Sequence, residues 1–234
     1  MAQIPAETTG NHRLADIARW RATGGPSMLD ELYLNYVPLV PEVRLHLARD
    51  AIILWARLEA EAKSAAPAPY WASAWAGGQA LARYLLDHPE VVAGKRVLDV
   101  GSGSGLAAIA AALAGASAVT ANDIDPYAIA AIRANAEVNR VSLSTSPMNL
   151  IHGDTYVADF DLITTGDGMY SPALAADMLR FLRRARDGGA EVLLGDPGRG
   201  HLPHSDLHML ATYPIAEPTL ADAEIRTASV FRLI

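Results

Sequence analysis

The stretch Val97–Gly105, with the sequence VLDVGSGSG, decides the fold of this 234-residue chain. An apolar run typical of a buried strand leads directly into three glycines at alternate positions, and the apolar residues 105–114 that follow favour a helix. Glycine allows a sharp turn and a close approach of the backbone to a ligand. The first N–H groups of a helix are free to bind that ligand. The stretch therefore predicts a strand–loop–helix binding site.

Strands and helices alternate along the chain from residue 67 to residue 234. We expect strands at 96–100, 117–122, 148–152, 160–165 and 191–195, and helices at 105–114, 126–139, 172–186 and 203–212. Such alternation predicts a mostly parallel sheet with helices on both faces. The last two expected strands, 215–219 and 224–233, have no long helix between them and predict an antiparallel hairpin. The fold class is therefore α/β, a Rossmann-like seven-strand sheet.

Residues 1–66 are expected to form an extension that packs on this core domain. The extension looks mostly helical, with an amphipathic helix at 50–63 and one short strand at 43–47. The segment 64–69, SAAPAP, has the composition of a linker or turn. We therefore place the domain boundary at about residue 66.

The glycine loop follows an acid, Asp99, and this distinguishes two possible cofactors. The dinucleotide fingerprint G-x-G-x-x-G requires a glycine where this chain has Leu106. Its pyrophosphate is an anion, so that loop needs no acid, whereas the methionine part of S-adenosylmethionine carries an ammonium group. We therefore predict that S-adenosylmethionine binds here, with S-adenosylhomocysteine as the product. The loop residues expected to contact it are Asp99, Gly101, Ser102, Gly103 and Gly105.

Acids also follow the next two expected strands. Asp123 falls where the second strand ends, and its carboxylate can accept both ribose hydroxyls. Asp154 follows the third strand and can accept from the adenine amine. Asp125 precedes Pro126 and is expected to cap the helix that begins there. Taken singly, each acid is equally well explained as a turn or cap residue; their succession at strand ends favours a cofactor site.

The segment after the fourth expected strand offers groups for a substrate. In a doubly wound sheet, ligands lie outside the carboxyl ends of the strands, so Asp167 and Tyr170 should face the methyl group. A lysine amine must lose its proton before it can attack, and its reference pKa is about 10.4. An acceptor and an aromatic wall suit that chemistry. The alternative is a turn acid that caps the helix at Pro172, next to a packed tyrosine.

Several motifs together resemble a family of protein lysine methyltransferases whose best-known member modifies the β subunit of electron transfer flavoprotein. The resemblance runs from about Pro41 to Arg199, and weakly to the end. It is carried by Pro69–Ala72, Trp75, Gly77–Leu81, Arg83–Asp87, the glycine loop, Ala121–Pro126, Gly166–Tyr170 and Gly195–Arg199. The resemblance implies that Asp167 and Tyr170 match the family's Asp-x-x-Phe/Tyr motif, where the target lysine is engaged. It also implies that Trp75 and Gln79 lie beside the cofactor, and that the flavoprotein subunit is the substrate.

Composition excludes several other classes of protein. The net charge is −7 without a dense block of Lys or Arg, which argues against a nucleic-acid partner. The absence of cysteine excludes disulfides and thiolate metal sites. The longest apolar run is too short to cross a membrane, and we expect a cytoplasmic protein. His204 and His208 lie four residues apart on an expected helix, but no third ligand is evident, so we expect no metal site.

Some alternatives remain open at this level. The same loop and acids suit a methyltransferase for a small-molecule amine or for a ribosomal-protein lysine. A protein that binds S-adenosylmethionine as a partner or sensor, without turnover, is a third possibility. An NAD-dependent dehydrogenase is disfavoured by the loop spacing. Arg199 and His201, beyond the fifth strand, either contact acids that flank the target lysine or belong to a rigid Pro- and Gly-containing turn.

Overall fold

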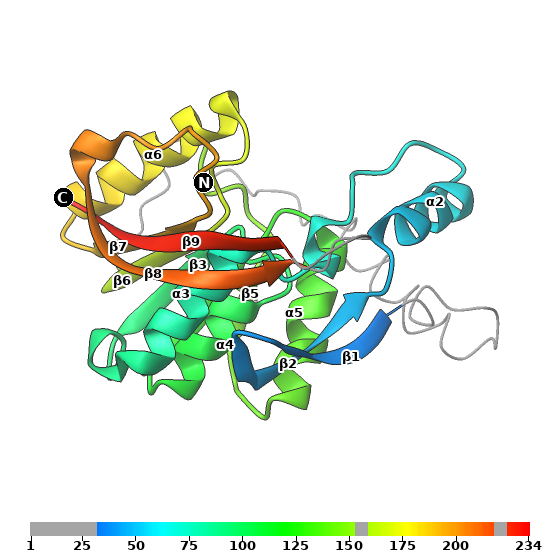
Figure 1. Ribbon diagram of the computed structural model, residues 1–234, viewed down its shortest axis with the longest axis horizontal. Coiled ribbons are helices and arrows are strands. Elements are labelled where there is room, and N and C mark those ends of the chain that lie inside the picture. Colours follow the sequence, from blue (N-terminus) through cyan, green and yellow to red (C-terminus); the bar gives the residue numbers. More distant parts are fainter. Residues whose placement is uncertain (1–31, 153–158, 218–223) are drawn as a thin grey trace, which may run out of the picture.

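A computed structural model describes residues 32–152, 159–217 and 224–234 of the chain (Figure 1). Asp154, expected to orient the adenine, lies outside the described residues. Within them, a seven-stranded sheet has the order β5-β4-β3-β6-β7-β9-β8. The parallel strands are β3 (Arg96–Val100), β4 (Ala118–Asn122), β5 (Ser144–Ser146), β6 (Leu162–Gly166) and β7 (Glu191–Asp196). The strands β8 (Leu207–Glu217) and β9 (Glu224–Leu233) add an antiparallel hairpin. The expected fold class is confirmed.

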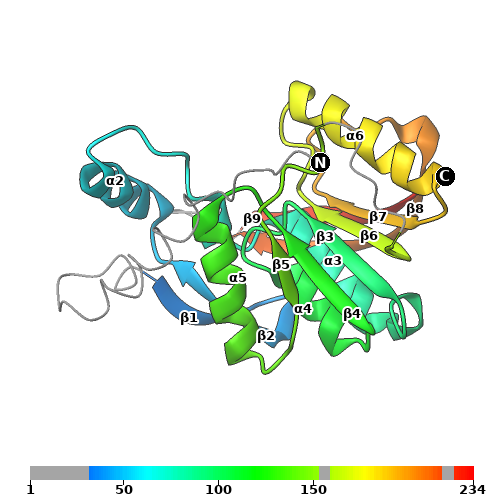
Figure 2. The same ribbon diagram turned by 180° about the vertical axis from the view of Figure 1, so that it is seen from behind.

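Helices cover both faces of the sheet, as Figures 1 and 2 show. On one face lie α3 (Ala76–Asp87), α4 (Leu106–Leu113) and α5 (Pro126–Val138), and on the other lies α6 (Pro172–Asp187). Successive residues of β3 explain the two layers, because Val97 packs with α3 and α4 while Leu98 packs with α6. Both side chains are buried, as expected for a parallel sheet that is covered on both sides.

Two expected elements are wrong. The third strand is the short polar β5, not 148–152; there Leu150 is buried against the α6 layer as part of a loop. Asn122 Nδ2 holds that loop by donating to the carbonyls of Ser146 and Met148, at 2.8 Å each. The expected helix at 203–212 is also wrong. Only a 3-10 turn, His204–Asp206, precedes β8, and His208 belongs to that strand, so the two histidines do not share a helix.

The described part of the extension begins with strands rather than helix. The strands β1 (Leu32–Val37) and β2 (Val40–Ala48) form an antiparallel pair, and α2 (Ala51–Ala62) follows, capped by Asp50. The edge of β2 that does not pair with β1 hydrogen-bonds to α5, where Asn135 Oδ1 accepts from His46 N at 2.8 Å. Buried β2 residues share a cluster with α3 and α4, so this segment adds to the core. No helix of the described residues is long and apolar enough to cross a membrane.

Candidate functional site

The glycine loop adopts the conformation that its sequence requires. Gly101, Gly103 and Gly105 have φ angles of 65°, 55° and 86°, in the left-handed region that favours glycine. Ser102 N donates to the Asn122 carbonyl at 2.9 Å, which ties the loop to the end of β4. Gly105 is the N-cap residue of α4, and a Cβ there would lie 3.4 Å from Ile132 Cγ1, so this glycine lets the loop pack closely on α5.

Asp99 lies behind this loop. Its side chain is 1% exposed, and its two oxygens accept from the Ser102 hydroxyl at 2.5 Å and the Thr164 hydroxyl at 2.8 Å. Burial raises the pKa of Asp99 to about 6, against the opposing effect of these two hydrogen bonds. Thr164, on β6, is a partner that sequence reasoning missed. Asp99 therefore holds the loop from inside the sheet rather than lining the space in front of it.

Asp123 faces the opposite way, into a cavity at the carboxyl ends of the strands. Its Oδ2 accepts from Gly103 N at 2.9 Å, and its Oδ1 accepts from Asp125 N at 3.0 Å. Burial raises the pKa of Asp123. Asp125 caps α5 as expected, accepting from Tyr127 N at 2.8 Å. Both acids line the cavity, but Asp123 binds the glycine loop whereas Asp125 caps a helix.

Asp167 is fixed by the packing of α3 against the sheet. Trp75 is the N-cap residue of α3 and makes no capping bond, but Asp167 Oδ2 accepts from Gly78 N in the first turn at 3.0 Å. This contact needs glycine at position 77, because a Cβ there would lie 2.3 Å from the Gly195 carbonyl oxygen and 2.7 Å from Asp167 Oδ2. Asp167 itself has a φ of 56°, unusual for a residue other than glycine.

A cation completes this end of the site. Arg199 Nη2 donates to Asp167 Oδ1 at 2.7 Å, and the guanidinium carbon lies 5.7 Å from the centre of the Trp75 ring. Burial raises the pKa of Asp167, which is 7% exposed, and Arg199 acts in the opposite direction. The main chain of Arg199 is held by the buried Asp196, whose Oδ1 accepts from Arg199 N at 3.1 Å. The Asp-Pro-Gly-Arg run is the sequence signal for this turn.

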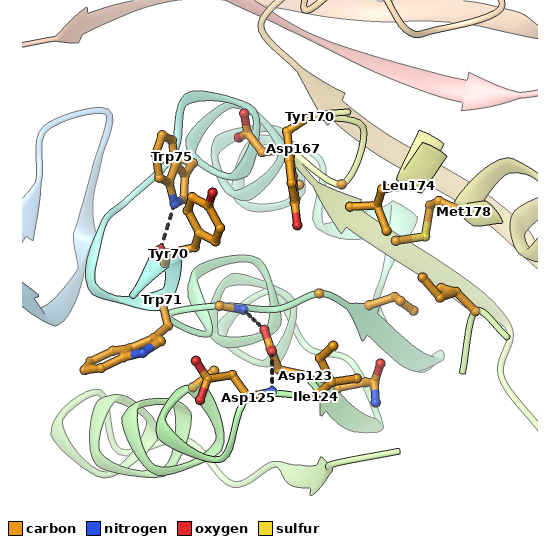
Figure 3. A pocket seen from close by; sticks show the side chains of 18 of the residues that line it. Tyr70, Trp71, Trp75, Asp123, Ile124, Asp125, Asp167, Tyr170, Leu174 and Met178 are labelled. Atoms are coloured by element: carbon orange, nitrogen blue, oxygen red, sulfur yellow. Dashed lines mark hydrogen bonds between the residues drawn. The ribbon is translucent and has the colours of Figure 1, made fainter. Parts of the chain in front are cut away.

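Three aromatic rings line the same end. Tyr70 lies 5.5 Å from Tyr170 and 5.9 Å from Trp75, measured between ring centres. Trp75 Nε1 donates to the Tyr70 carbonyl at 2.7 Å. Trp75 and Tyr170 remain 39% and 50% exposed. The rings therefore form an open aromatic wall beside Asp167, in the arrangement that Figure 3 shows.

One cavity of about 530 Å³ joins these groups. Figure 3 shows Asp123 and Asp125 on one side of it and Asp167, Tyr170, Tyr70 and Trp75 on the other. Its size lies within the range of small-molecule sites. Of the residues predicted from sequence, the structure brings together Trp75, Gly101, Gly103, Asp123, Asp167 and Tyr170 along its lining.

The other predicted residues stand behind the lining. Asp99, Ser102 and Gly105 belong to the support of the loop, as described above. Gln79 is buried on α3, and its Nε2 donates to the Ala74 carbonyl at 2.7 Å, so it stabilises the turn that carries Trp75. No group of three or more metal-ligating side chains occurs in the part of the chain that the structure describes.

Comparison with known proteins identifies the family. A relative from Xenopus laevis, the electron transfer flavoprotein β subunit lysine methyltransferase, is 46% identical over 189 residues, covering 80% of this chain and 74% of the relative. The protein of the same name from Homo sapiens is 42% identical over 191 residues, covering 77% and 70%. The chain belongs to this lysine methyltransferase family. It is therefore a methyltransferase, and the cavity described above is the candidate active site of that enzyme.

Two further comparisons agree at a coarser level. Residues 79–165 match the sequence model of the ribosomal protein L11 methyltransferase family, PrmA. A proposed RNA methyltransferase from Pyrococcus horikoshii has a similar structure, with a TM-score of 0.50 at 16% identity, covering 66% of this chain and 81% of that one. At this identity the likeness concerns the fold, which the lysine methyltransferase shares with enzymes of other substrates.

Proposed function

We propose that this enzyme transfers the methyl group of S-adenosylmethionine to a lysine side chain of the electron transfer flavoprotein β subunit. The substrate proposal rests on the relatives. Their names include that substrate, and their sequences align with about four fifths of this chain. The single structural observation behind it is that one cavity contains both the glycine loop and the aromatic wall around Asp167. A donor and a side chain from a partner protein can meet there.

The donor end of the cavity fits S-adenosylmethionine. Gly101 and Gly103 bring bare backbone to the lining, and no atom of the described residues outside the neighbouring positions lies within 4 Å of a Cβ built at Gly101. Asp123 offers a carboxylate that suits the ribose hydroxyls, and Leu150 and Ile151 offer apolar surface for the adenine. We assign those roles to them, and the adenine amine to Asp154. When bound, the donor supplies a sulfonium leaving group.

The acceptor end fits a lysine. The rings of Tyr70, Trp75 and Tyr170 form a wall for the alkyl stem, and Asp167 provides an acceptor at its end. We assign to Asp167 and Tyr170 the alignment of the amine with the methyl group, because alignment is the main requirement of an in-line displacement. Burial raises the pKa of the Tyr170 hydroxyl, so it stays protonated and can donate or accept a hydrogen bond.

A transfer assay tests this function. The enzyme is incubated with tritiated S-adenosylmethionine and recombinant electron transfer flavoprotein, and with the same flavoprotein carrying Lys→Arg substitutions in its β subunit. Label on the β subunit that is lost on substitution is the expected result. Label that appears only on small molecules of a cell extract would contradict the lysine assignment. Donor binding without any S-adenosylhomocysteine would indicate a sensor instead of an enzyme that turns over.

Ribosomal protein L11 is a second candidate substrate, because the PrmA model matches residues 79–165. That segment contains the glycine loop and Asp123 but ends before Asp167, so the match concerns the donor end. Recombinant L11 belongs in the same assay. If the enzyme methylates L11 faster than the flavoprotein at equal concentrations, L11 becomes the favoured substrate.

We also propose a cytoplasmic location and a protein partner rather than nucleic acid. The negative net charge and the lack of cysteine are compatible with both. Cell fractionation with an antibody, and a gel-shift assay with total RNA, test them. An organelle-bound protein or a stable RNA complex would overturn the corresponding proposal.

A further inference from the structure

Arg199 occupies a place that the transfer reaction alone does not explain. It reaches over the face of Trp75 and pairs with Asp167 in the acceptor end of the cavity. The turn that carries Arg199 is fixed by hydrogen bonds of its main chain. Asp196 Oδ1 accepts from the main-chain N–H of Gly198 at 2.6 Å and of Arg199 at 3.1 Å, and Gly198 has a φ of 86°. A buried carboxylate and a left-handed glycine therefore direct this side chain toward Asp167.

The charges around the cavity make this cation distinctive. Among the described residues of the lining, Asp123, Asp125 and Asp167 are acidic, whereas Arg199 alone carries a positive charge. The other titratable groups that face the acceptor end are the hydroxyls of Tyr70 and Tyr170. Asp123 and Asp125 lie at the donor end, away from Asp167. At the acceptor end, Arg199 is the group that offsets Asp167.

This balance matters because only a neutral amine can react. An unpaired, nearly buried carboxylate stabilises a neighbouring ammonium ion, which has no lone pair. In the transfer step, the lone pair of the amine nitrogen forms the new N–C bond while the C–S bond breaks and its electron pair stays on sulfur. The nitrogen must therefore lose one proton to water before the step, and a secondary or tertiary amine product loses its extra proton to water afterwards.

We infer that Arg199 is a positioning residue that acts through Asp167: it cancels the charge of the carboxylate so that the lysine amine is held in its neutral form. Asp167 then keeps lone pairs that accept from the amine N–H without attracting an ammonium ion. The guanidinium carbon already lies 5.7 Å from the centre of the Trp75 ring, which disfavours a second cation over the same face. This inference rests on the proposed transfer to an amine, but not on which protein carries the lysine.

The pH dependence of kcat tests the inference, since it reports the protonation of groups in the enzyme–substrate complex. R199Q keeps a hydrogen-bond donor and removes the charge, whereas R199K keeps the charge in a different shape. Removing a charge at about 4–6 Å moves a neighbouring titration by about 1–3 pH units. We expect the acidic limb of R199Q to move upward by at least about 1 unit. Its kcat is then at least about tenfold below wild type near neutral pH, and approaches it at high pH.

R199K is expected to turn over more slowly but to retain the position of the wild-type limb. An R199Q profile that is lowered by the same factor at every pH would show a merely structural role and overturn the inference. A rise of KM for the protein substrate at unchanged kcat would also overturn the inference, because it would indicate that Arg199 binds an acidic residue of that substrate. Circular dichroism and donor affinity, compared with wild type, show that each variant is folded.

A binding experiment gives a readout that does not depend on turnover or on the identity of the substrate. Choline and its neutral carbon isostere have the same shape and differ in charge. Titration of each into the enzyme, followed by NMR at the indole N–H of Trp75, measures the preference of the acceptor end. We expect wild type to prefer the neutral compound and R199Q to shift toward choline by about tenfold. An unchanged ratio in R199Q would overturn the inference even if transfer to the flavoprotein is confirmed. If no protein accepts the methyl group but the ratio shifts, the proposed substrate fails while the role of Arg199 stands.

Discussion

Gly77→Ala tests whether the site depends on contact between the backbone of α3 and that of β7. A Cβ at position 77 would lie 2.3 Å from the Gly195 carbonyl oxygen. Rotation of a side chain cannot relieve this clash, because the nearest atom is main chain. Ordinary contact between such atoms begins above about 3 Å, so α3 must move by roughly 1 Å. That movement would separate Gly78 N from Asp167 and displace Trp75.

The expected cost follows from two opposing effects. Overpacking a well-packed contact costs about 1–3 kcal/mol, and replacing glycine by alanine in a helix returns about 0.5–1 kcal/mol. The difference between these effects lies between about 0 and 2.5 kcal/mol, and we expect the free energy of unfolding to fall by about 1 kcal/mol. For a protein of this size, the melting temperature changes by about 2–4 °C per kcal/mol, so Gly77→Ala should melt about 2–4 °C lower.

Gly78→Ala is the matched control, since it makes the same change one residue along the same helix. A Cβ at Gly78 meets no other atom within 4 Å. We expect this variant to melt about 1–4 °C higher than wild type, from helix propensity alone. Thermal and urea unfolding followed by circular dichroism measure both variants, and methyl transfer is assayed in parallel. Equal stability of the two variants would refute the packing argument.

Three further predictions concern the acids. Burial raises the pKa of Asp99 to about 6, above the value of about 3.9 in an unfolded chain. The stability that its proton contributes is thus present below about pH 4 and lost as the pH rises through about 6. In urea unfolding, Asp99→Asn should lose less stability than wild type between those values, and equal slopes would contradict this. Asp123→Asn should weaken S-adenosylmethionine binding by about 10–100-fold in calorimetry; an unchanged Kd would exclude its ribose role. Asp167→Ala should abolish transfer yet keep measurable donor binding, and retained turnover would rule out its assigned role.

The parallel core of the fold was predictable because its strands are short apolar runs that end at glycines or acids. β3 and its loop show both signals within nine residues. β5 was missed because it is only Ser144–Ser146, polar throughout, and is defined by pairing with β4 rather than by its own pattern. The first half of β8 was mispredicted for a related reason, since a strand was expected only at 215–219 and a helix before it. Its pairing with β9 extends over ten positions, and this long-range partner overrides the local preference of 203–212 for helix.

The candidate site was predictable in position but not in its contacts. The carboxyl ends of neighbouring strands meet at one edge, so Asp123 and Asp167 were expected there. The direction of a side chain is a different matter. Asp99 points into the sheet because Thr164, 65 residues later, donates to it, and nothing near Asp99 in the sequence shows this. The pairing of Asp167 with Arg199 is likewise made by two separate strand ends.

The stability of α3 and the chemistry of the acceptor end depend on the same carboxylate. The N-cap residue of α3 is Trp75, whose side chain does not cap the helix. The first turn of α3 instead donates to Asp167, which follows the end of β6. Asp167 holds a left-handed conformation, which costs of order 1–2 kcal/mol. The hydrogen bonds of Gly78 and Arg199 to its side chain, and of its own N–H to the Gly195 carbonyl, offset that cost. A carboxylate that is strained, buried and bound from two sides has little freedom to move. It therefore holds Trp75 on one side and Arg199 on the other at fixed distances, which is what the alignment of a lysine amine requires.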